Sequence, residues 1–196
     1  NINDKVCSWL EKNTAKFDVV IVPDFGNGFI STGMIQQLCK HARFLAVNAQ
    51  VNSGNRGYHS INHYPRADFI SLNISELRIA THDRHGAIEI LAKKIISQLG
   101  AKYVAVTQGK DGAILLNRSP ETVYETPALS TQVIDRIGAG DTFLSLVGLC
   151  LGGNLSSEVA LFVGSAAAAL DVQMVCNRES IIPVNLYKYI NTLLKS

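Results

Sequence analysis

A short glycine-rich segment in front of an apolar repeat is the part of this sequence best suited to chemistry. Residues 138–140 read Gly-Ala-Gly and are followed directly by Asp141, and apolar residues then recur every four positions through residue 151. This pattern predicts a helix that begins near Asp141, with exposed N–H groups at its positive end that attract an anion. A phosphate-binding loop with a carboxylate at its rim suits transfer of a phosphoryl group to a hydroxyl. A glycine-rich turn that only begins a core helix is the alternative.

The whole segment, residues 135–143, resembles the C-terminal signature Asp-x-x-Gly-Ala-Gly-Asp-Thr-Phe of the PfkB/ribokinase family of sugar and nucleoside kinases. Arg136 replaces the family's usual Thr, a departure that leaves the anion loop intact. The resemblance implies an ATP-dependent carbohydrate kinase that transfers the γ-phosphate to a hydroxyl of a sugar or sugar phosphate. The catalytic residues that it implies are Asp141, as the base, with Gly138, Ala139 and Gly140.

Asn73 and Glu76 form a second group of polar residues, just after an apolar run. They are three positions apart and therefore share one face of a helix that begins there. Their oxygens suit hydrated Mg²⁺ beside phosphates, although the spacing alone favours a helix cap. Leu-Asn-x-x-Glu also resembles the family motif that orders magnesium and phosphate-bound water. The resemblance therefore implies Mg²⁺ held near Glu76 and Asn73 through water.

Other expected nucleotide and cation ligands come from the same resemblance. Residues 106–112 are similar to the family's Val-Thr-x-Gly-x-x-Gly, and residues 164–169 are similar to its small-residue helix near the adenine. A plain turn and ordinary helix packing are the alternatives for these two segments. Asp135 and the Ile137 carbonyl correspond to ligands of a monovalent cation such as K⁺ in some family members. The nucleotide ligands that the resemblance implies are Thr107, Gly109, Gly112, Asn73 and Ser165.

Asp24 and Asn48 are the candidate ligands for sugar hydroxyls, although either could cap a turn. With residues 55–58, 64–68 and 176–178, the segments around them resemble the sugar-kinase domain of bifunctional heptose-phosphate kinase/nucleotidyltransferase proteins. This makes a heptose phosphate the leading candidate substrate. The resemblance leaves open a fused nucleotidyltransferase domain and a homodimer.

Apolar β-branched runs alternate with helical patterns along the chain. We expect strands at residues 18–22, 44–47, 69–72, 103–106 and 113–116, and helices near residues 35–39, 88–99, 141–151, 156–170 and 184–194. Such alternation predicts an α/β fold with a mostly parallel sheet and helices on both faces, and the resemblance implies a ribokinase-like, Rossmann-type three-layer sandwich. Residues 117–133 are expected to form a hairpin and loop. Because ligands bind at the carboxyl ends of parallel strands, Asp24, Asn48, Asn73 and Thr107 should gather at one edge.

Composition limits the function classes. The chain of 196 residues is 47% hydrophobic and 17% charged, with a net charge of +2, so neither nucleic acid nor an acidic membrane surface is expected as a partner. The four cysteines form no C-x-x-C pair, which favours free thiols in a reducing, cytoplasmic compartment over zinc. His59 and His63 have metal-ligand spacing, but no third ligand is apparent nearby, and we interpret both as surface imidazoles.

Family members begin with a Gly-Gly signature and a β-sheet lid, and neither is found here. We therefore expect residues 1–196 to be a single α/β domain, the C-terminal portion of a PfkB-type kinase with the N-terminal part and lid missing. Turnover by this portion alone should be poor, because a lid completes such sites. A non-catalytic nucleotide-binding module of a bifunctional protein is the alternative. A dinucleotide-binding domain is disfavoured, since Ser31 stands where the third glycine of the Gly26-x-Gly28 pattern belongs.

Overall fold

The computed structural model describes residues 1–52, 54–55, 58–130, 133–135, 137–174 and 180–195. Residues 56–57, Arg136 and residues 176–178, which take part in the family resemblance, lie outside the described residues. Within the described part, no helix is both long and apolar enough to cross a membrane.

A six-stranded sheet in the order β1-β2-β3-β4-β5-β6 forms the centre of the molecule. The strands are β1 (Val20–Asp24), β2 (Leu45–Ala49), β3 (Phe69–Asn73), β4 (Tyr103–Thr107), β5 (Ala113–Arg118) and β6 (Glu121–Thr126). The pairs β1–β2, β2–β3 and β3–β4 are parallel, whereas β5 and β6 continue the sheet antiparallel. The five expected strands are confirmed, and the hairpin expected after residue 117 forms from β5 and β6. The first strand begins at Val20, two residues later than expected.

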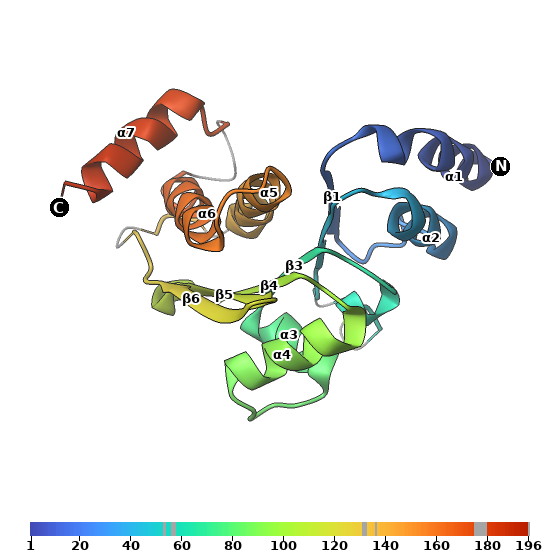
Figure 1. Cartoon of the computed structure of the whole chain (residues 1–196), viewed down its shortest axis with the longest axis horizontal. Helices are drawn as coiled ribbons and strands as arrows, with labels where there is room; N and C mark the ends of the chain where they lie inside the picture. Colours follow the sequence, from blue (N-terminus) through green and yellow to red (C-terminus); the bar gives the residue numbers. More distant parts are fainter. Residues whose placement is uncertain (53, 56–57, 131–132, 136, 175–179, 196) are drawn as a thin grey trace.

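Helices cover both faces of this sheet, which confirms the three-layer prediction. They are α1 (Ile2–Asn13), α2 (Thr32–His41), α3 (Ile74–Thr81), α4 (Ile88–Leu99), α5 (Ala139–Gly152), α6 (Ser157–Asp171) and α7 (Pro183–Leu193). Figure 1 shows α5 and α6 on one face and α3 and α4 on the other, while α2 contributes to the same core cluster as α3 and α4. The sequence analysis did not predict α1, and none of its residues is fully buried.

The alternation of strand side chains separates the core into two layers. In β2, Leu45 and Val47 face the cluster with α2, α3 and α4, and Ala46 faces α5 and α6. The small Ala46 allows α5 to approach closely, since a Cβ at Gly148 would lie 3.0 Å from the Ala46 side chain. Phe143 is 2% exposed in this second layer. Its burial stabilises the fold by roughly 1.5–3 kcal/mol and fixes the first turn of α5.

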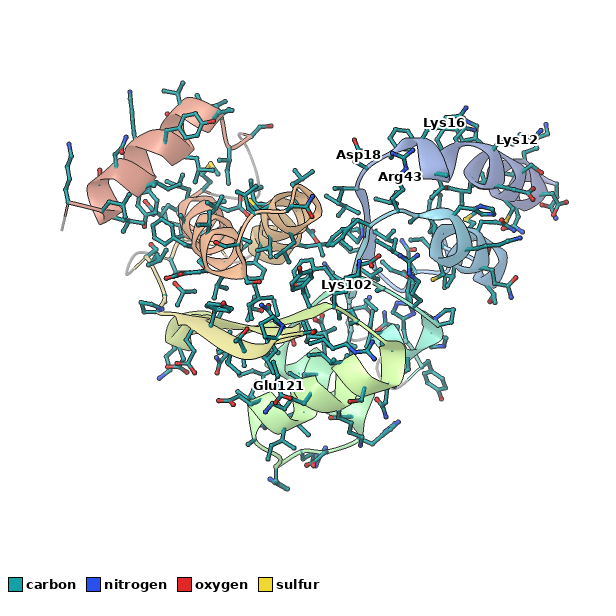
Figure 2. All side chains as sticks on the ribbon, in the orientation of Figure 1. Lys12, Lys16, Asp18, Arg43, Lys102 and Glu121 are labelled. Atoms are coloured by element: carbon teal, nitrogen blue, oxygen red, sulfur yellow. The ribbon has the colours of Figure 1, made fainter. Side chains whose placement is uncertain are left out.

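The charged residues at the amino end of the sheet are paired with each other. Asp68 is buried and accepts hydrogen bonds from the Leu45 N–H at 2.9 Å and from the Arg66 guanidinium. The Lys102 ammonium lies 3.2 Å from the other oxygen of the same carboxylate, and Figure 2 shows Lys102 at this end of the strands. A buried charge is tolerated where it is paired and hydrogen-bonded in this way. Asp68 therefore has a structural role, and the amino end of the sheet presents no open carboxylate there.

We expect Gly112→Ala to destabilise the fold strongly. Gly112 has φ of +88°, and an added Cβ would lie 2.0 Å from the Thr126 carbonyl oxygen in the neighbouring strand. Backbone strain alone is worth about 1–3 kcal/mol, and the steric overlap adds to it. Thermal unfolding should show a clear drop in Tm. Gly109→Ala is the matched control: Gly109 also has a positive φ, but its Cβ would meet nothing within 4 Å. A Tm for Gly112→Ala no lower than that of Gly109→Ala would contradict the steric argument.

Candidate active site

The carboxyl ends of the parallel strands lie level with one another. Asp24, the last residue of β1, pairs with Ala49, and Asn73, the last residue of β3, pairs with Thr107 at the end of β4. The polar residues that follow these strands therefore share one edge, as the order of the elements predicts. The N-terminus of α5 reaches the same edge, where the Gln50 side chain donates a hydrogen bond to Asp141.

Glu76 is held at this edge by a reciprocal helix cap. The Asn73 side chain accepts a hydrogen bond from the Glu76 N–H, and the Asn73 N–H donates to the Glu76 carboxylate, both at 2.9 Å. Two further donors reach the carboxylate, the Asn48 amide at 3.2 Å and the Val51 N–H at 3.4 Å. Asn73 and Glu76 therefore do form the helix cap that their spacing favours. It also places a carboxylate of fixed orientation beside the end of β3.

The pKa of Glu76 is raised. Burial of the carboxyl is the main cause, and the negative charge of Asp141 adds to it, while the hydrogen bonds from Asn73, Val51 and Asn48 act in the opposite direction. Mutual influence of this kind means that the Glu76 and Asp141 carboxylates share one electrostatic environment. A bound cation would relieve the cost of keeping both ionised.

Asp141 lies in the first turn of α5, behind a glycine-rich N-terminus. Gly138 is the N-cap residue with φ of +94°, a conformation that favours glycine. Among the described residues, no side chain caps this helix, so the N–H groups of its first turn are available to an anion. Burial raises the pKa of Asp141, and Asp171 raises it further, while the hydrogen bond from Gln50 lowers it.

A cleft of about 550 Å³ lies beside these groups and fits the expected nucleotide ligands. It is lined by Val51, Asn52, Asn73, Ile74, Ser75, Ile79, Thr107, Gln108 and Gly109. The exposed turn at Gly109 has open space on its Cβ side, so a ligand can approach its backbone. The cleft thus brings Asn73, Thr107 and Gly109 together, as the resemblance implies.

A second hollow, of about 520 Å³, is lined by Asp141. Its lining includes Thr142, Asp171 and Ser180, together with apolar residues of α5, α6 and α7. Asp171 is 5% exposed and accepts a hydrogen bond from the Thr142 hydroxyl at 3.3 Å. Asp141 therefore lines this second hollow, and Gln50, which donates to it, is followed directly by Val51 and Asn52 in the lining of the first cleft. Sequence reasoning missed Asp171, because it falls at the end of an alanine-rich helix.

The other expected ligands have contacts of their own. The Asp135 carboxylate accepts a hydrogen bond from the Ile137 N–H at 3.0 Å, and its N–H donates to the Val172 carbonyl. The Ser165 hydroxyl, on α6, is buried and has no hydrogen-bond partner in the part of the chain that the structure describes. Gly112 contacts the backbone of residues 126–127 rather than the cleft. Their roles in cation and nucleotide binding remain predictions.

Asp24 and Asn48 are held by internal contacts. The Asp24 carboxylate is 2% exposed and accepts hydrogen bonds from the Tyr64 hydroxyl at 2.8 Å and the Gly26 N–H at 3.0 Å. The Asn48 amide donates to the Ser71 carbonyl as well as to Glu76. Sugar binding by Asp24 and Asn48 stays a prediction, and their visible role is to organise the edge.

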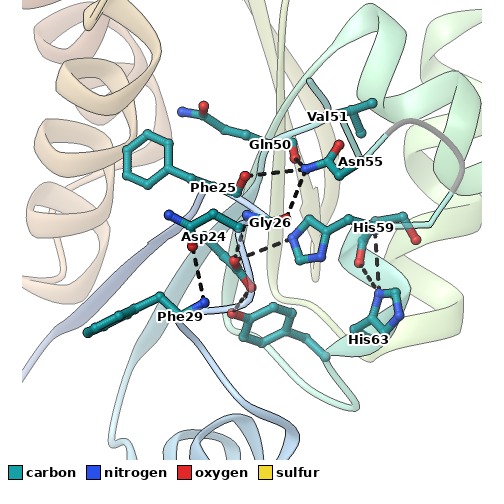
Figure 3. Close-up of polar contacts among 12 residues, drawn as sticks. Asp24, Phe25, Gly26, Phe29, Gln50, Val51, Asn55, His59 and His63 are labelled. Atoms are coloured by element: carbon teal, nitrogen blue, oxygen red, sulfur yellow. Dashed lines mark hydrogen bonds and ion pairs between the residues drawn. The ribbon is translucent and has the colours of Figure 1, made fainter. Parts of the chain in front are cut away.

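His59 differs from its sequence interpretation. Its side chain is 16% exposed, and its Nε2 lies 3.4 Å from Asp24 Oδ1, as Figure 3 shows. The expectation of a surface imidazole is therefore wrong for His59, because the loop after β2 folds onto the end of β1. His63 is exposed, so the expectation of a surface imidazole is confirmed for this residue. Its ring stacks on the His59 ring, with 5.5 Å between the two ring centroids.

The described residues contain no group of three or more His, Cys, Asp or Glu side chains that could hold a metal ion by direct ligation. Oxygen donors at Glu76 and Asn73 fit a hydrated Mg²⁺ that would keep most of its waters beside phosphates. The α5 N-terminus, which no described side chain caps, suits phosphate groups. The cleft at Asn73 and Thr107 has room for the rest of a nucleotide.

Comparison with known proteins identifies the family of the chain. The family described as pfkB family carbohydrate kinase matches residues 34–182. A protein named Bifunctional protein HldE from Campylobacter fetus subsp. fetus is 26% identical over 183 residues, covering 91% of this chain and 38% of the relative. Its namesake from Magnetococcus marinus is 31% identical over 157 residues, covering 79% of this chain and 31% of the relative.

Solved structures share the fold. Ribokinase of Arabidopsis thaliana, in complex with ribose and ATP, has a TM-score of 0.71 at 21% identity, over 99% of this chain and 59% of that chain. Phosphofructokinase-2 of Escherichia coli, in complex with potassium, has a TM-score of 0.77 at 16% identity, over 96% of this chain and 62% of that chain. The chain thus spans less than two thirds of these proteins, and 38% or less of the two HldE relatives. With a family match over more than half of its length and a ribokinase-like fold, the chain belongs to the pfkB family of carbohydrate kinases.

Proposed function

We propose that this chain is the nucleotide-binding and catalytic part of an ATP-dependent kinase that phosphorylates a hydroxyl of a sugar or sugar phosphate. One observation carries the proposal: the half-buried Asp141 carboxylate stands in the first turn of a helix whose N-terminal N–H groups are free of side-chain caps in the described structure. A base and an anion site are thereby adjacent, as transfer of a phosphoryl group to a hydroxyl requires.

Asp141 accepts the proton of the sugar hydroxyl as the hydroxyl oxygen attacks the γ-phosphorus. The bond between that phosphorus and the bridging oxygen breaks, ADP leaves, and the sugar gains the phosphoryl group. The N–H groups of residues 138–141 stabilise the charge on the transferring oxygens. Burial raises the pKa of Asp141, and this makes the carboxylate a stronger base once it is ionised.

Mg-ATP supplies the phosphoryl group when it is bound. We assign Thr107, Gly109 and Asn73 to the nucleotide, because they line one cleft. Glu76 would hold magnesium through water, since its carboxylate is already oriented by three donors, the Asn73 N–H, the Val51 N–H and the Asn48 amide. Asp135 is the proposed ligand of a monovalent cation, for which the potassium complex of Escherichia coli phosphofructokinase-2 is the nearest support.

A heptose phosphate is the proposed substrate, because the HldE proteins are among the relatives that the chain resembles over 91% and 79% of its length. Residues 1–196 would then be the C-terminal portion of a kinase domain. The word bifunctional in the names of these relatives supports a fused second activity in the full natural protein.

Two measurements on the full natural protein test this function. Calorimetry with Mg-ATP should show binding, and a panel of hexoses, heptoses and their phosphates should include one that yields ADP and a new phosphate ester. Nucleotide binding with no transfer to any sugar would favour the non-catalytic module. Absence of binding at millimolar Mg-ATP would contradict the assignment of the cleft.

We expect Glu76→Gln to weaken the magnesium dependence of the reaction. An amide lacks the charge that orders magnesium-bound water, and changes in groups outside the metal's direct ligands typically weaken metal affinity by about 10–100-fold. Rates measured against Mg²⁺ at saturating ATP give the apparent affinity, and Tm checks that the cap of α3 survives. Glu11→Gln, on the exposed surface of α1, is the matched control. An unchanged magnesium dependence in a folded Glu76→Gln variant would rule out this role.

A further inference from the structure

Gln50 connects the second strand to the proposed base. Its side-chain amide donates a hydrogen bond to Asp141 Oδ1 at 3.0 Å, across 91 positions of sequence. Gln50 lies just past the end of β2 and is half-buried. Among the described residues, Asp141 Oδ2 has no hydrogen-bond partner, so the Gln50 contact holds one oxygen and leaves the other open to a hydroxyl.

The Gln50 backbone is clamped from both sides. Its N–H donates to the Asp24 carbonyl at 2.8 Å, and its carbonyl accepts a hydrogen bond from the Asn55 amide at 3.1 Å. The Asn55 amide also reaches the loop after β1, with its Nδ2 3.3 Å from the Phe25 carbonyl oxygen, and Figure 3 shows this network. A side chain that starts from a backbone fixed in this way loses less freedom when it holds a partner.

The contact at Gly26 shows how closely these two loops fit. Gly26 has φ of +64°, and an added Cβ would lie 2.1 Å from the Asn55 amide nitrogen. The loops after β1 and β2 are therefore packed against each other without room for a side chain. This packing of the two loops fixes the position of Gln50 beside the active site.

The electrostatic surroundings of Asp141 give this hydrogen bond its importance. Among the described residues, the charged groups that face Asp141 from the packed elements are Asp171 on α6 and Glu76 on α3, and both are acidic. Burial and Asp171 raise the pKa of Asp141, and the Gln50 amide is the group that lowers it. A neutral amide donor thus favours the ionised, proton-accepting form of the base.

We propose that Gln50 is a positioning residue for the kinase reaction: it orients the Asp141 carboxylate through Oδ1, while Oδ2 receives the proton of the sugar hydroxyl. This role rests on the proposed function. It assigns to the loop after β2 a part in catalysis that differs from ligand binding, because Gln50 acts through Asp141.

Gln50→Leu tests the role in the full natural protein. Loss of a hydrogen bond to a charged group should lower kcat by about 10–100-fold near neutral pH, with the KM for ATP unchanged. The acid limb of the kcat profile should move to higher pH, because the raised pKa of Asp141 is no longer opposed. Gln50→Glu should move it further, since a third carboxylate then faces the base. Gln98→Leu, on the exposed side of α4, is the matched control.

An NMR titration of Asp141 tests the role of Gln50 without requiring kinase activity. The Asp141 carboxyl carbon, assigned with Asp141→Asn, should titrate at higher pH in Gln50→Leu than in the wild type by NMR, with or without kinase activity. Equal titration in both proteins would overturn the inference. A higher sugar KM with an unmoved acid limb would also overturn it and make Gln50 a substrate ligand. If the wild type phosphorylates no sugar, the proposed function fails, and the NMR titration still decides the role of Gln50.

Discussion

Asp141→Asn should lower kcat for sugar phosphorylation by about 10²–10⁴-fold, the usual contribution of a general base. Asn has nearly the same shape and still accepts the hydrogen bond that Gln50 donates to Asp141 Oδ1. The amide cannot take the proton of the attacking hydroxyl, so the chemical step is affected and not the fold. The KM for ATP should remain within a few-fold of the wild type, because the cleft at Asn73 and Thr107 is unchanged.

Rapid-quench single-turnover kinetics measure this loss directly and separate it from product release. Asp18→Asn provides a matched control: Asp18 is an exposed aspartate that pairs with Arg43 near the start of β1, at a distance from the site (Figure 2). We expect wild-type kcat for the control. Phosphorylation by Asp141→Asn at the wild-type rate would show that another group accepts the proton.

Substitution of the loop glycines should reduce kcat by about 10²–10³-fold, which is the cost of losing one anion-hole donor. The structure distinguishes the two positions. Gly138→Ala places a side chain at φ of +94° and should lower both stability and kcat. An added Cβ at Gly140 meets nothing within 4 Å, so Gly140→Ala should fold normally. Its methyl group would instead project into open space beside the N–H groups that bind the phosphoryl group.

Paired measurements of Tm and kcat distinguish these mechanisms. Gly140→Ala should combine a wild-type Tm with a reduced kcat, whereas Gly138→Ala should lower both. Gly109→Ala, at the far side of the cleft, shows how much a single added methyl group affects nucleotide binding. Wild-type kcat in Gly140→Ala would place the transferring phosphoryl group elsewhere.

The sequence alone determined the class of the fold and most of its elements. The helix over residues 88–99 was predicted with its observed bounds, because five buried apolar residues at helical spacing end at Gly100, which caps the helix with φ of +62°. The strands could also be predicted from the sequence, since a buried parallel strand is an uninterrupted apolar run. The sequence analysis did not predict α1, although Asn1 and Asp4 at its start have the spacing of a capping box.

Only part of the site could be predicted from the sequence. Residues 138–141 and the Asn73–Glu76 pair act within one turn of helix each, so local spacing carries their signal. The contacts of Asp24 with His59 and Tyr64, and of Gln50 with Asp141, join segments between 35 and 91 positions apart. Such contacts depend on which loops meet when parallel strands align at their carboxyl ends, and that is decided by the packing of the whole sheet. The sequence by itself therefore predicted the base and the anion loop, and the tertiary structure alone showed that the Gln50 side chain contacts Asp141.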